Sequence, residues 1–215
     1  MNTKHQKISV AVDVLLFTIS DDKLQIVLTK RSSEPFKDMY CLPGVSLQEN
    51  ETPEEAAERS LRERTGLTDI FLEQLYTFGD TERDPRSRTI SIAYYALTDP
   101  DKLLSSNLNE AAVLMPADRI LSGRIKLAFD HKKIIEYGRM RLKGKVSYSD
   151  IAFEFVPEDF TLPQLQKVYE ILLGEELYKA NFRKMISPKV EATGEMLTGL
   201  AHRPSRLYRR KKARP

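Results

Sequence analysis

The sequence contains one cysteine, Cys41, and no tryptophan among its 215 residues. A single cysteine excludes an internal disulfide framework and a zinc site built from several cysteines. No apolar run approaches the ~20 residues that a membrane-spanning helix requires. The first residues pass from a short polar tip into alternating apolar positions, without the cleavage site of a secretory signal. We therefore expect a cytoplasmic protein with no membrane partner.

Net positive charge is absent from the first two thirds of the chain and concentrated near its end. Residues 1–145 contain 22 basic and 22 acidic residues, whereas residues 146–215 contain 12 and 9. From Lys179 onward, 11 basic residues stand against Glu191 and Glu195 only, an excess of nine positive charges. A local excess of this kind is typical of a segment that binds a polyanion.

Strand patterns dominate the first hundred residues. Alternating apolar residues from Ser9 to Arg31 are interrupted by the polar step SDD, which predicts two strands joined by a hairpin connection. The segments IFLEQLYTFG and TISIAYYAL predict a second pair around the charged loop Asp80–Arg88. Between the pairs, Thr52, Pro53 and Glu55 have the pattern of a capped helix start, and Gly66 predicts its end.

The rest of the sequence predicts a second, smaller domain. A helix is expected over 127–142, with Leu127, Ile134, Ile135 and Met140 on its apolar face, and the polar segment KGKVSYSD (143–150) is expected to be a linker. Helices then follow, the first beginning after Thr161 and ending at Gly174, and a two-stranded ribbon closes the chain. This order is typical of a winged helix-turn-helix. We place the domains at residues 1–145 and 146–215.

The segment ETPEEAAERSLRERTGL resembles the Nudix box, whose pattern is Gly, five residues, Glu, seven residues, then Arg-Glu-apolar-any-Glu-Glu-any-Gly-apolar. The alignment has no gap and places on this pattern Val45, Glu51, Arg59, Ser60, Leu61, Glu63, Arg64, Gly66 and Leu67. The resemblance implies an α+β protein whose first domain has the Nudix fold, an α/β/α sandwich around a mixed sheet.

The box has lost most of its metal ligands. In the family, carboxylates at helix positions i, i+3 and i+4 hold Mg²⁺ against a diphosphate, but here these positions carry Ser60, Glu63 and Arg64. Val45 also replaces a glycine of a loop that approaches the ligand. We therefore expect no catalytic residues and no required cofactor. A weak Mg²⁺ site remains open, formed by Glu51 and Glu63 with Glu73 or Asp84.

Together, the two domains resemble the NrtR family of Nudix-related transcriptional regulators and its sugar-responsive relatives. The motif FDH (129–131) and the run FTLPQL (160–165) also look like that family. The resemblance implies a dimer whose winged helix binds a palindromic operator in double-stranded DNA and whose first domain senses a small effector. In the family that effector is ADP-ribose, with repression of genes for NAD synthesis or salvage; a sister branch senses arabinose.

Candidate effector-binding residues lie in and around the charged loop. Arg31, Arg83 and Arg86 are expected to hold phosphates, and Asp80 and Asp84 to hold hydroxyls. Tyr94 or Tyr95 is expected to stack on an adenine or a sugar, and strand alternation leaves only one of them facing the pocket. His131, beside Phe129, is expected to cap or pack rather than to act as a base or ligand.

Candidate DNA-binding residues lie in the basic segment. On the presumed recognition helix we expect base or phosphate contacts from Arg183 and Lys184, with Lys179 and Asn181 also facing outward. On the wing we expect phosphate contacts from Arg203, Arg206 and Arg209. Two other functions remain: a hydrolase of ADP-ribose-like nucleoside diphosphates, and an RNA-binding adaptor. The adaptor ranks last because the sequence lacks an aromatic platform for single strands.

Overall fold

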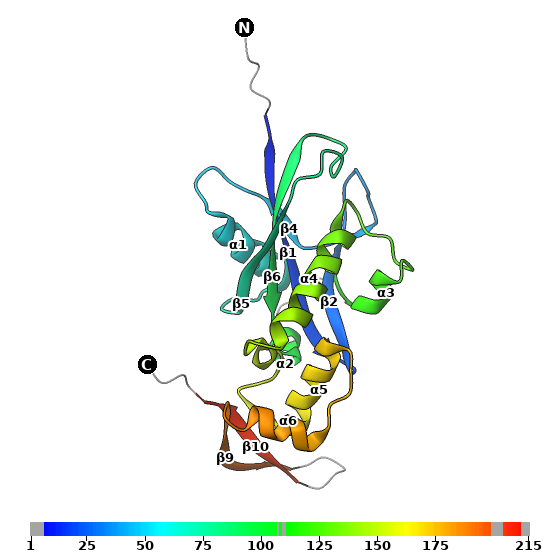
Figure 1. Cartoon of the computed structure of the whole chain (residues 1–215). Coiled ribbons are helices and arrows are strands. Elements are labelled where there is room, and N and C mark those ends of the chain that lie inside the picture. Colours follow the sequence, from blue (N-terminus) through cyan, green and yellow to red (C-terminus); the bar gives the residue numbers. More distant parts are fainter. Residues whose placement is uncertain (1–6, 107, 109–110, 199–203, 212–215) are drawn as a thin grey trace.

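The computed structural model describes residues 7–106, 108, 111–198 and 204–211. A larger part, built around a mixed β-sheet, contains the amino-terminal half of the chain (Figure 1). A smaller part of helices and a second sheet lies at the opposite end of the molecule from the start of the first strand. Within the described residues no helix is long and apolar enough to cross a membrane.

Seven strands form the larger sheet. They pair in the order β3-β2-β1-β6-β5, with β4 beside β1 and β7 beside β2. Only β1 and β6 run parallel, and the other pairs are antiparallel, so the sheet is mixed as expected. The bounds are β1 (Ser9–Ser20), β2 (Lys23–Lys30), β3 (Tyr40–Cys41), β4 (Gly44–Ser46), β5 (Phe71–Phe78), β6 (Thr89–Leu97) and β7 (Ala112–Pro116).

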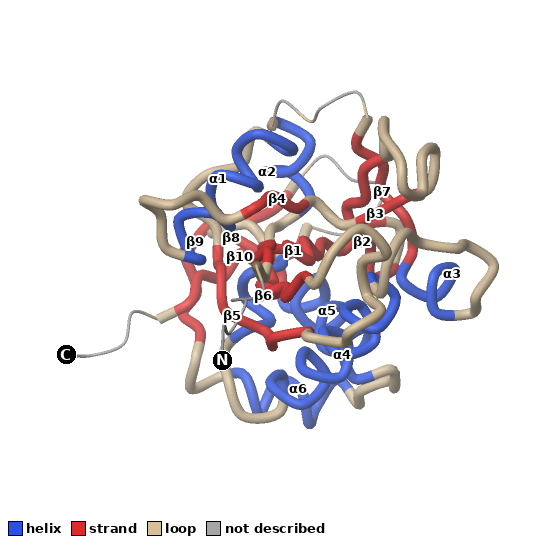
Figure 2. Tube along the Cα trace, turned by 90° about the horizontal axis from the view of Figure 1, so that it is seen from above, coloured by secondary structure: helices blue, strands red, loops and turns tan. Residues whose placement is uncertain are grey.

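Alternation along β1 gives the sheet two buried faces. Val12 and Leu16 point to one face, which α1 (Pro53–Thr65) and α2 (Pro100–Ser105) cover. Leu15 and Phe17 point to the other, where α3 (Ala117–Leu121) and α4 (His131–Val146) pack. Viewed from above, the strands therefore lie between two layers of helices (Figure 2).

The ends of α1 form as the sequence predicts. The hydroxyl of Thr52 accepts from the backbone NH of Glu55, and the Glu55 carboxylate accepts from the NH of Thr52 at 2.7 Å. Gly66 ends the helix in the left-handed conformation, with φ of 70°. Val45, in contrast, does not lie in a loop: it belongs to β4 and pairs with Val12, so its side chain fits ordinary strand geometry.

Helix α4 differs from its prediction at both ends. It begins at His131 and continues to Val146, so the first half of the expected linker is helical. This last turn was not predicted because its sequence is polar. In the structure, the amino group of Lys145 forms an ion pair with Glu73, and Val146 is buried. The prediction that Met140 faces the core was also wrong, since it is 64% exposed. Instead, Gly138 packs directly against Leu15 of β1, so closely that a Cβ at this position would lie 2.3 Å from the Leu15 side chain.

The smaller part is a winged helix with one strand more than expected. Thr161 and Gln164 form a capping box at the start of α5, and Gly174 ends that helix, as predicted. Leu142 and Val146 of α4 share a hydrophobic cluster with Leu165 of α5, so the two parts have a continuous core. The elements are η1 (Ile151–Phe155), β8 (Asp159–Thr161), α5 (Leu162–Leu173), α6 (Lys179–Ile186), β9 (Val190–Leu197) and β10 (Ser205–Arg210), with sheet order β8-β10-β9.

Candidate functional site

A cavity of about 570 Å³ opens at the amino-terminal end of β1. The end of β2, strands β3 and β4, the last turn of α1, the loop 83–87 and the start of α4 contribute to its wall. Its volume lies within the range of ordinary small-molecule sites, roughly 300–1,000 Å³. Cationic side chains outnumber anionic ones five to two, since the lining includes Lys30, Arg31, Arg64, Arg83 and Arg86 against Asp13 and Asp84.

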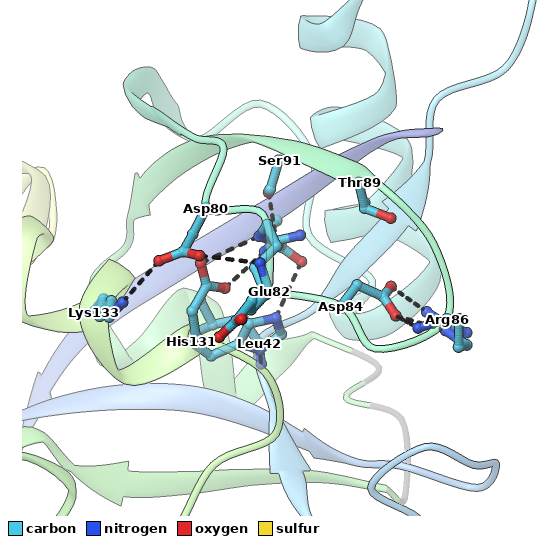
Figure 3. A network of polar contacts seen from close by, with 12 residues as sticks. Leu42, Asp80, Glu82, Asp84, Arg86, Thr89, Ser91, His131 and Lys133 are labelled. Atoms are coloured by element: carbon cyan, nitrogen blue, oxygen red, sulfur yellow. Dashed lines mark hydrogen bonds and ion pairs between the residues drawn. The ribbon is translucent and has the colours of Figure 1, made fainter. Parts of the chain in front are cut away.

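A buried ion-pair network forms the floor of this cavity. Arg83 donates to Asp13 of β1 at 3.2 Å and to Asp130, which precedes α4, at 2.8 Å. Ser91 of β6 also donates to Asp13, at 2.6 Å (Figure 3). Burial alone would lower the pKa of Arg83, but its bonds with the two carboxylates raise the pKa above the usual value. Arg83 therefore stays charged and is already fully engaged by protein groups.

His131 completes the floor as a neutral acceptor. Its Nδ1 accepts a hydrogen bond from the backbone NH of Leu42 at 2.9 Å, and its ring packs on Phe129 with centroids 5.4 Å apart. Burial lowers the pKa of His131, although the neighbouring Asp13 opposes that shift. The prediction that His131 caps or packs is confirmed.

The mouth of the cavity is built around Phe129. The guanidinium carbons of Arg31 and Arg86 lie 4.6 Å and 5.6 Å from its ring centroid, a cation–π arrangement. Arg86 also holds Asp84 by two hydrogen bonds, of 3.0 and 2.8 Å, which lower the pKa of Asp84 (Figure 3). Of the expected effector residues, four lie at this cavity: Arg31, Arg83, Asp84 and Arg86.

The other expected effector residues lie elsewhere. Asp80 is exposed on the loop and pairs with Lys133 at 3.4 Å, outside the cavity wall (Figure 3). Neither Tyr94 nor Tyr95 lines the cavity, so the expectation that one of them faces it was wrong. Alternation does send them to opposite faces, but helices cover both: Tyr94 lies in the cluster under α1, and Tyr95 accepts from Lys145 of α4.

A second charged surface lies on the winged helix. Phe182 and Ile186 bury one side of α6, while Lys179, Asn181, Arg183 and Lys184 are all exposed. None of those exposed cations forms an ion pair within the described part of the chain.

The wing carries two of the three expected arginines within the described residues. Arg206 is exposed, whereas Arg209 bonds Asp159 of β8 through Nε and Nη2 at 2.8 and 2.9 Å. Arg203 lies outside the residues that the structure describes.

The two parts match two families. Residues 9–137 match the NUDIX domain, and residues 152–210 match the NrtR DNA-binding winged helix domain. The "ADPR responsive transcriptional repressor NtrR" of Acinetobacter baylyi is 34% identical over 205 residues, which cover 92% of this chain and 80% of the relative. The chain belongs to the NrtR family.

Solved structures agree with this membership. Shewanella oneidensis NrtR, solved with a 27mer DNA, is 34% identical, with a TM-score of 0.84 over 94% of this chain and 93% of that chain. Its Nudix domain, solved with ADP ribose, is 30% identical, with a TM-score of 0.58 over 66% of this chain and 93% of that chain. An "ADP-ribose pyrophosphatase" of Methanocaldococcus jannaschii is 36% identical over 128 residues, 60% of this chain and 71% of that relative.

In the Nudix box of this NrtR-family chain, the surviving carboxylates Glu51 and Glu63 are both paired with Arg59. Arg59 contacts Glu51 at 2.6 Å and Glu63 at 3.7 Å. The hydroxyl of Ser60 is buried with no hydrogen-bond partner in the described structure. Glu73 pairs with Lys145 and Arg141 and so is not available at the box. Among the described residues no group of three or more His, Cys, Asp or Glu side chains could hold a metal ion, and this donor set does not fit Mg²⁺.

The acidic members of the floor, Asp13 and Asp130, and the pocket cation Lys30 were not among the residues predicted from the sequence. Asp13 did carry a signal, because it is the only charged residue in the apolar strand segment SVAVDVLLFTI. A buried carboxylate requires a partner. Arg83, which provides it, lies 70 positions away, so no local pattern connects the two.

Proposed function

We propose that this chain is a DNA-binding transcriptional repressor that responds to ADP-ribose. The pocket near the start of β1 binds the effector, and α6 with the wing binds the operator. The regulated genes are those of NAD synthesis or salvage. The protein acts in the cytoplasm as a homodimer on a palindromic site, with half-sites about one helical turn apart.

The pocket's charge carries the proposal. Five cationic side chains surround one cavity in the Nudix part, and a phosphate-containing ligand supplies the negative charge that this wall selects. Arg31 and Arg86 lie at its mouth over Phe129, where an aromatic base or ring can be held beside the phosphates. Relatives that respond to ADPR or were solved with ADP ribose support the identity of the ligand.

Charge also separates ADP-ribose from an arabinose-type sugar. An uncharged sugar binds through hydroxyl groups and brings no negative charge to the guanidinium groups of the cavity, whereas a phosphate forms charge-assisted hydrogen bonds with them. Asp84, the carboxylate expected to hold hydroxyls, is already occupied by Arg86. The geometry therefore favours the nucleotide.

Hydrolysis of ADP-ribose is the second candidate, because of the likeness to the pyrophosphatase. The surviving box carboxylates, Glu51 and Glu63, both contact Arg59, so they are poor ligands for a divalent cation. We expect no Mg²⁺- or Mn²⁺-dependent release of AMP from ADP-ribose. Release that Glu63→Gln abolishes would establish the enzyme instead.

Fluorescence anisotropy tests the proposal directly. A labelled duplex from upstream of this protein's gene and a random duplex are titrated at near-physiological salt, with no addition, with ADP-ribose or with L-arabinose. We expect sequence-specific binding that ADP-ribose weakens and L-arabinose leaves unchanged. Equal binding to both duplexes, unaffected by either compound, would show that the basic segment acts only through its charge.

A further inference from the structure

The cations of the pocket differ in whether the protein has already neutralised them. Arg83 bonds Asp13 and Asp130, and Arg86 bonds Asp84. Lys30 lies 3.3 Å from Asp38. These three positive charges therefore have carboxylate partners before any ligand arrives.

Arg31 and Arg64 have no carboxylate partner in the described part of the chain. The guanidinium of Arg31 donates to the backbone carbonyl oxygens of Pro35, at 2.9 Å, and Ser33, at 3.4 Å. Arg64 lies exposed in the last turn of α1 and reaches the wall of the cavity, with no ion pair among the described residues. Two uncompensated guanidinium groups thus share one cavity.

Arg64 also occupies the position at which the Nudix pattern has a metal-binding carboxylate. The other two positions of that set do not restore a metal site, because Ser60 is a buried serine and Glu63 contacts Arg59. The Arg64 side chain therefore provides the positive charge that a bound metal ion provides in the Nudix pattern. The carboxyl-terminal end of α1 suits it, since the helix dipole favours a cation there.

We propose that Arg64 and Arg31 form a metal-independent site for the diphosphate of the effector, with the Arg64 guanidinium in place of the family's divalent cation. A diphosphate bridge is doubly anionic, so its charge matches the two unpaired guanidinium groups. The planar fork of arginine donates two parallel hydrogen bonds to phosphate oxygens. The inference rests on the proposed function, in which that effector is ADP-ribose.

This substitution has a consequence for regulation. In the Nudix pattern the cation both binds the diphosphate and prepares it for hydrolysis, whereas a guanidinium binds it without activating water. An effector held by Arg64 and Arg31 is therefore not consumed at the site. The occupancy of the pocket then follows the concentration of the effector and not its turnover.

Calorimetric titration of the full chain with ADP-ribose tests the proposal, in buffer with EDTA and in buffer with Mg²⁺. We expect the wild-type Kd to agree within about twofold between the two buffers. Arg64→Glu, which restores the family residue, should weaken binding in EDTA by about tenfold or more. Arg62→Glu is the matched control: it makes the same charge change two residues earlier in α1, on the side of the helix that lines a different hollow, and should change the Kd by less than about twofold.

The outcomes separate this inference from the proposed function. Wild-type binding of ADP-ribose that requires Mg²⁺, or equal losses in Arg64→Glu and Arg62→Glu, would overturn the inference and leave the effector assignment intact. If ADP-ribose binds in neither buffer, the effector assignment fails, and inorganic pyrophosphate tests the site by itself. Pyrophosphate binding in EDTA that Arg64→Glu removes would support the site, and no pyrophosphate binding by the wild type would overturn it.

Discussion

Arg83 and Asp130 lie 47 positions apart in the sequence and form two hydrogen bonds, from Nη2 at 2.8 Å and from Nε at 3.2 Å. Asp130 immediately precedes α4, whose other end packs on the winged helix. Since Arg83 also bonds Asp13 of β1, one guanidinium joins the charged loop, the central strand and the start of the helix that connects the two parts.

Arg83→Ala should therefore lower the free energy of unfolding by about 3–5 kcal/mol, because it leaves two buried carboxylates without their partner. Urea denaturation followed by circular dichroism measures the change. Arg88→Ala in the same loop is the control: Arg88 donates to the carbonyl oxygen of Asp80 at the surface, and its loss should cost about 1 kcal/mol or less. Similar values for the two variants would show that the buried network contributes little.

His131 should make stability depend on pH near neutrality. Burial keeps its folded-state pKa below the unfolded value of about 6.5. As the pH falls through 6.5 toward the folded-state pKa, the unfolded chain binds a proton that the native protein does not, so stability decreases by up to about 1.4 kcal/mol per pH unit. Above that window, the histidine contributes no slope.

Urea unfolding between about pH 7.5 and 5.5 measures whether stability falls with pH. This range extends about one unit to either side of the unfolded-state pKa of histidine. His131→Gln should remove the slope. The double variant His5→Gln/His202→Gln, which changes the other two histidines of the sequence, should retain it. If the double variant loses the slope and His131→Gln keeps it, His131 is not the source of the pH dependence.

Local signals in the sequence predicted most elements of the fold. Caps and glycine stops placed both ends of α1 and of α5, because those signals act within a few residues. The extension of α4 to Val146 was missed because its last turn reads as polar, and its stability comes from packing against η1 and α5. Strand β8 was missed because three residues carry too little pattern.

Three of the five cations of the candidate site, Arg31, Arg83 and Arg86, were predicted from the sequence, but the geometry of the site was not. Arg31 and Arg86 were predicted because arginine side chains suit phosphate groups, and both reach the cavity. Tyr94 and Tyr95 were misplaced because alternation gives the face of a strand but not what covers that face. The partners of Asp13 depend on contacts 70 and 78 positions apart, which follow only from the assembled sheet.

Arg183→Ala should reduce specific DNA binding by about 1–3 kcal/mol if its guanidinium makes a bidentate base contact. Arg183 is exposed on α6, outside the side that Phe182 and Ile186 bury, so it can reach the major groove if α6 is the recognition helix. Lys184→Ala is the comparison, expected to weaken operator and random duplexes alike and to reduce the salt slope by about one. Anisotropy on both duplexes at several salt concentrations separates the two effects, and equal losses on both duplexes for Arg183→Ala would make it a phosphate contact only.

Arg206 and Arg209 are three positions apart in the wing strand β10 and should contribute unequally to DNA binding. Arg209 forms ion pairs with Asp159 at 2.8 Å and Glu158 at 3.3 Å, whereas Arg206 has no ion pair in the part of the chain that the structure describes. Each phosphate that a protein cation neutralises adds about 0.9 to the salt slope. Arg206→Ala should therefore reduce the slope of log K against log salt by nearly that amount, and Arg209→Ala by markedly less. Asp159→Asn, which releases Arg209 from its main partner, should increase the slope; if it does not, the wing arginine faces the protein and not the DNA.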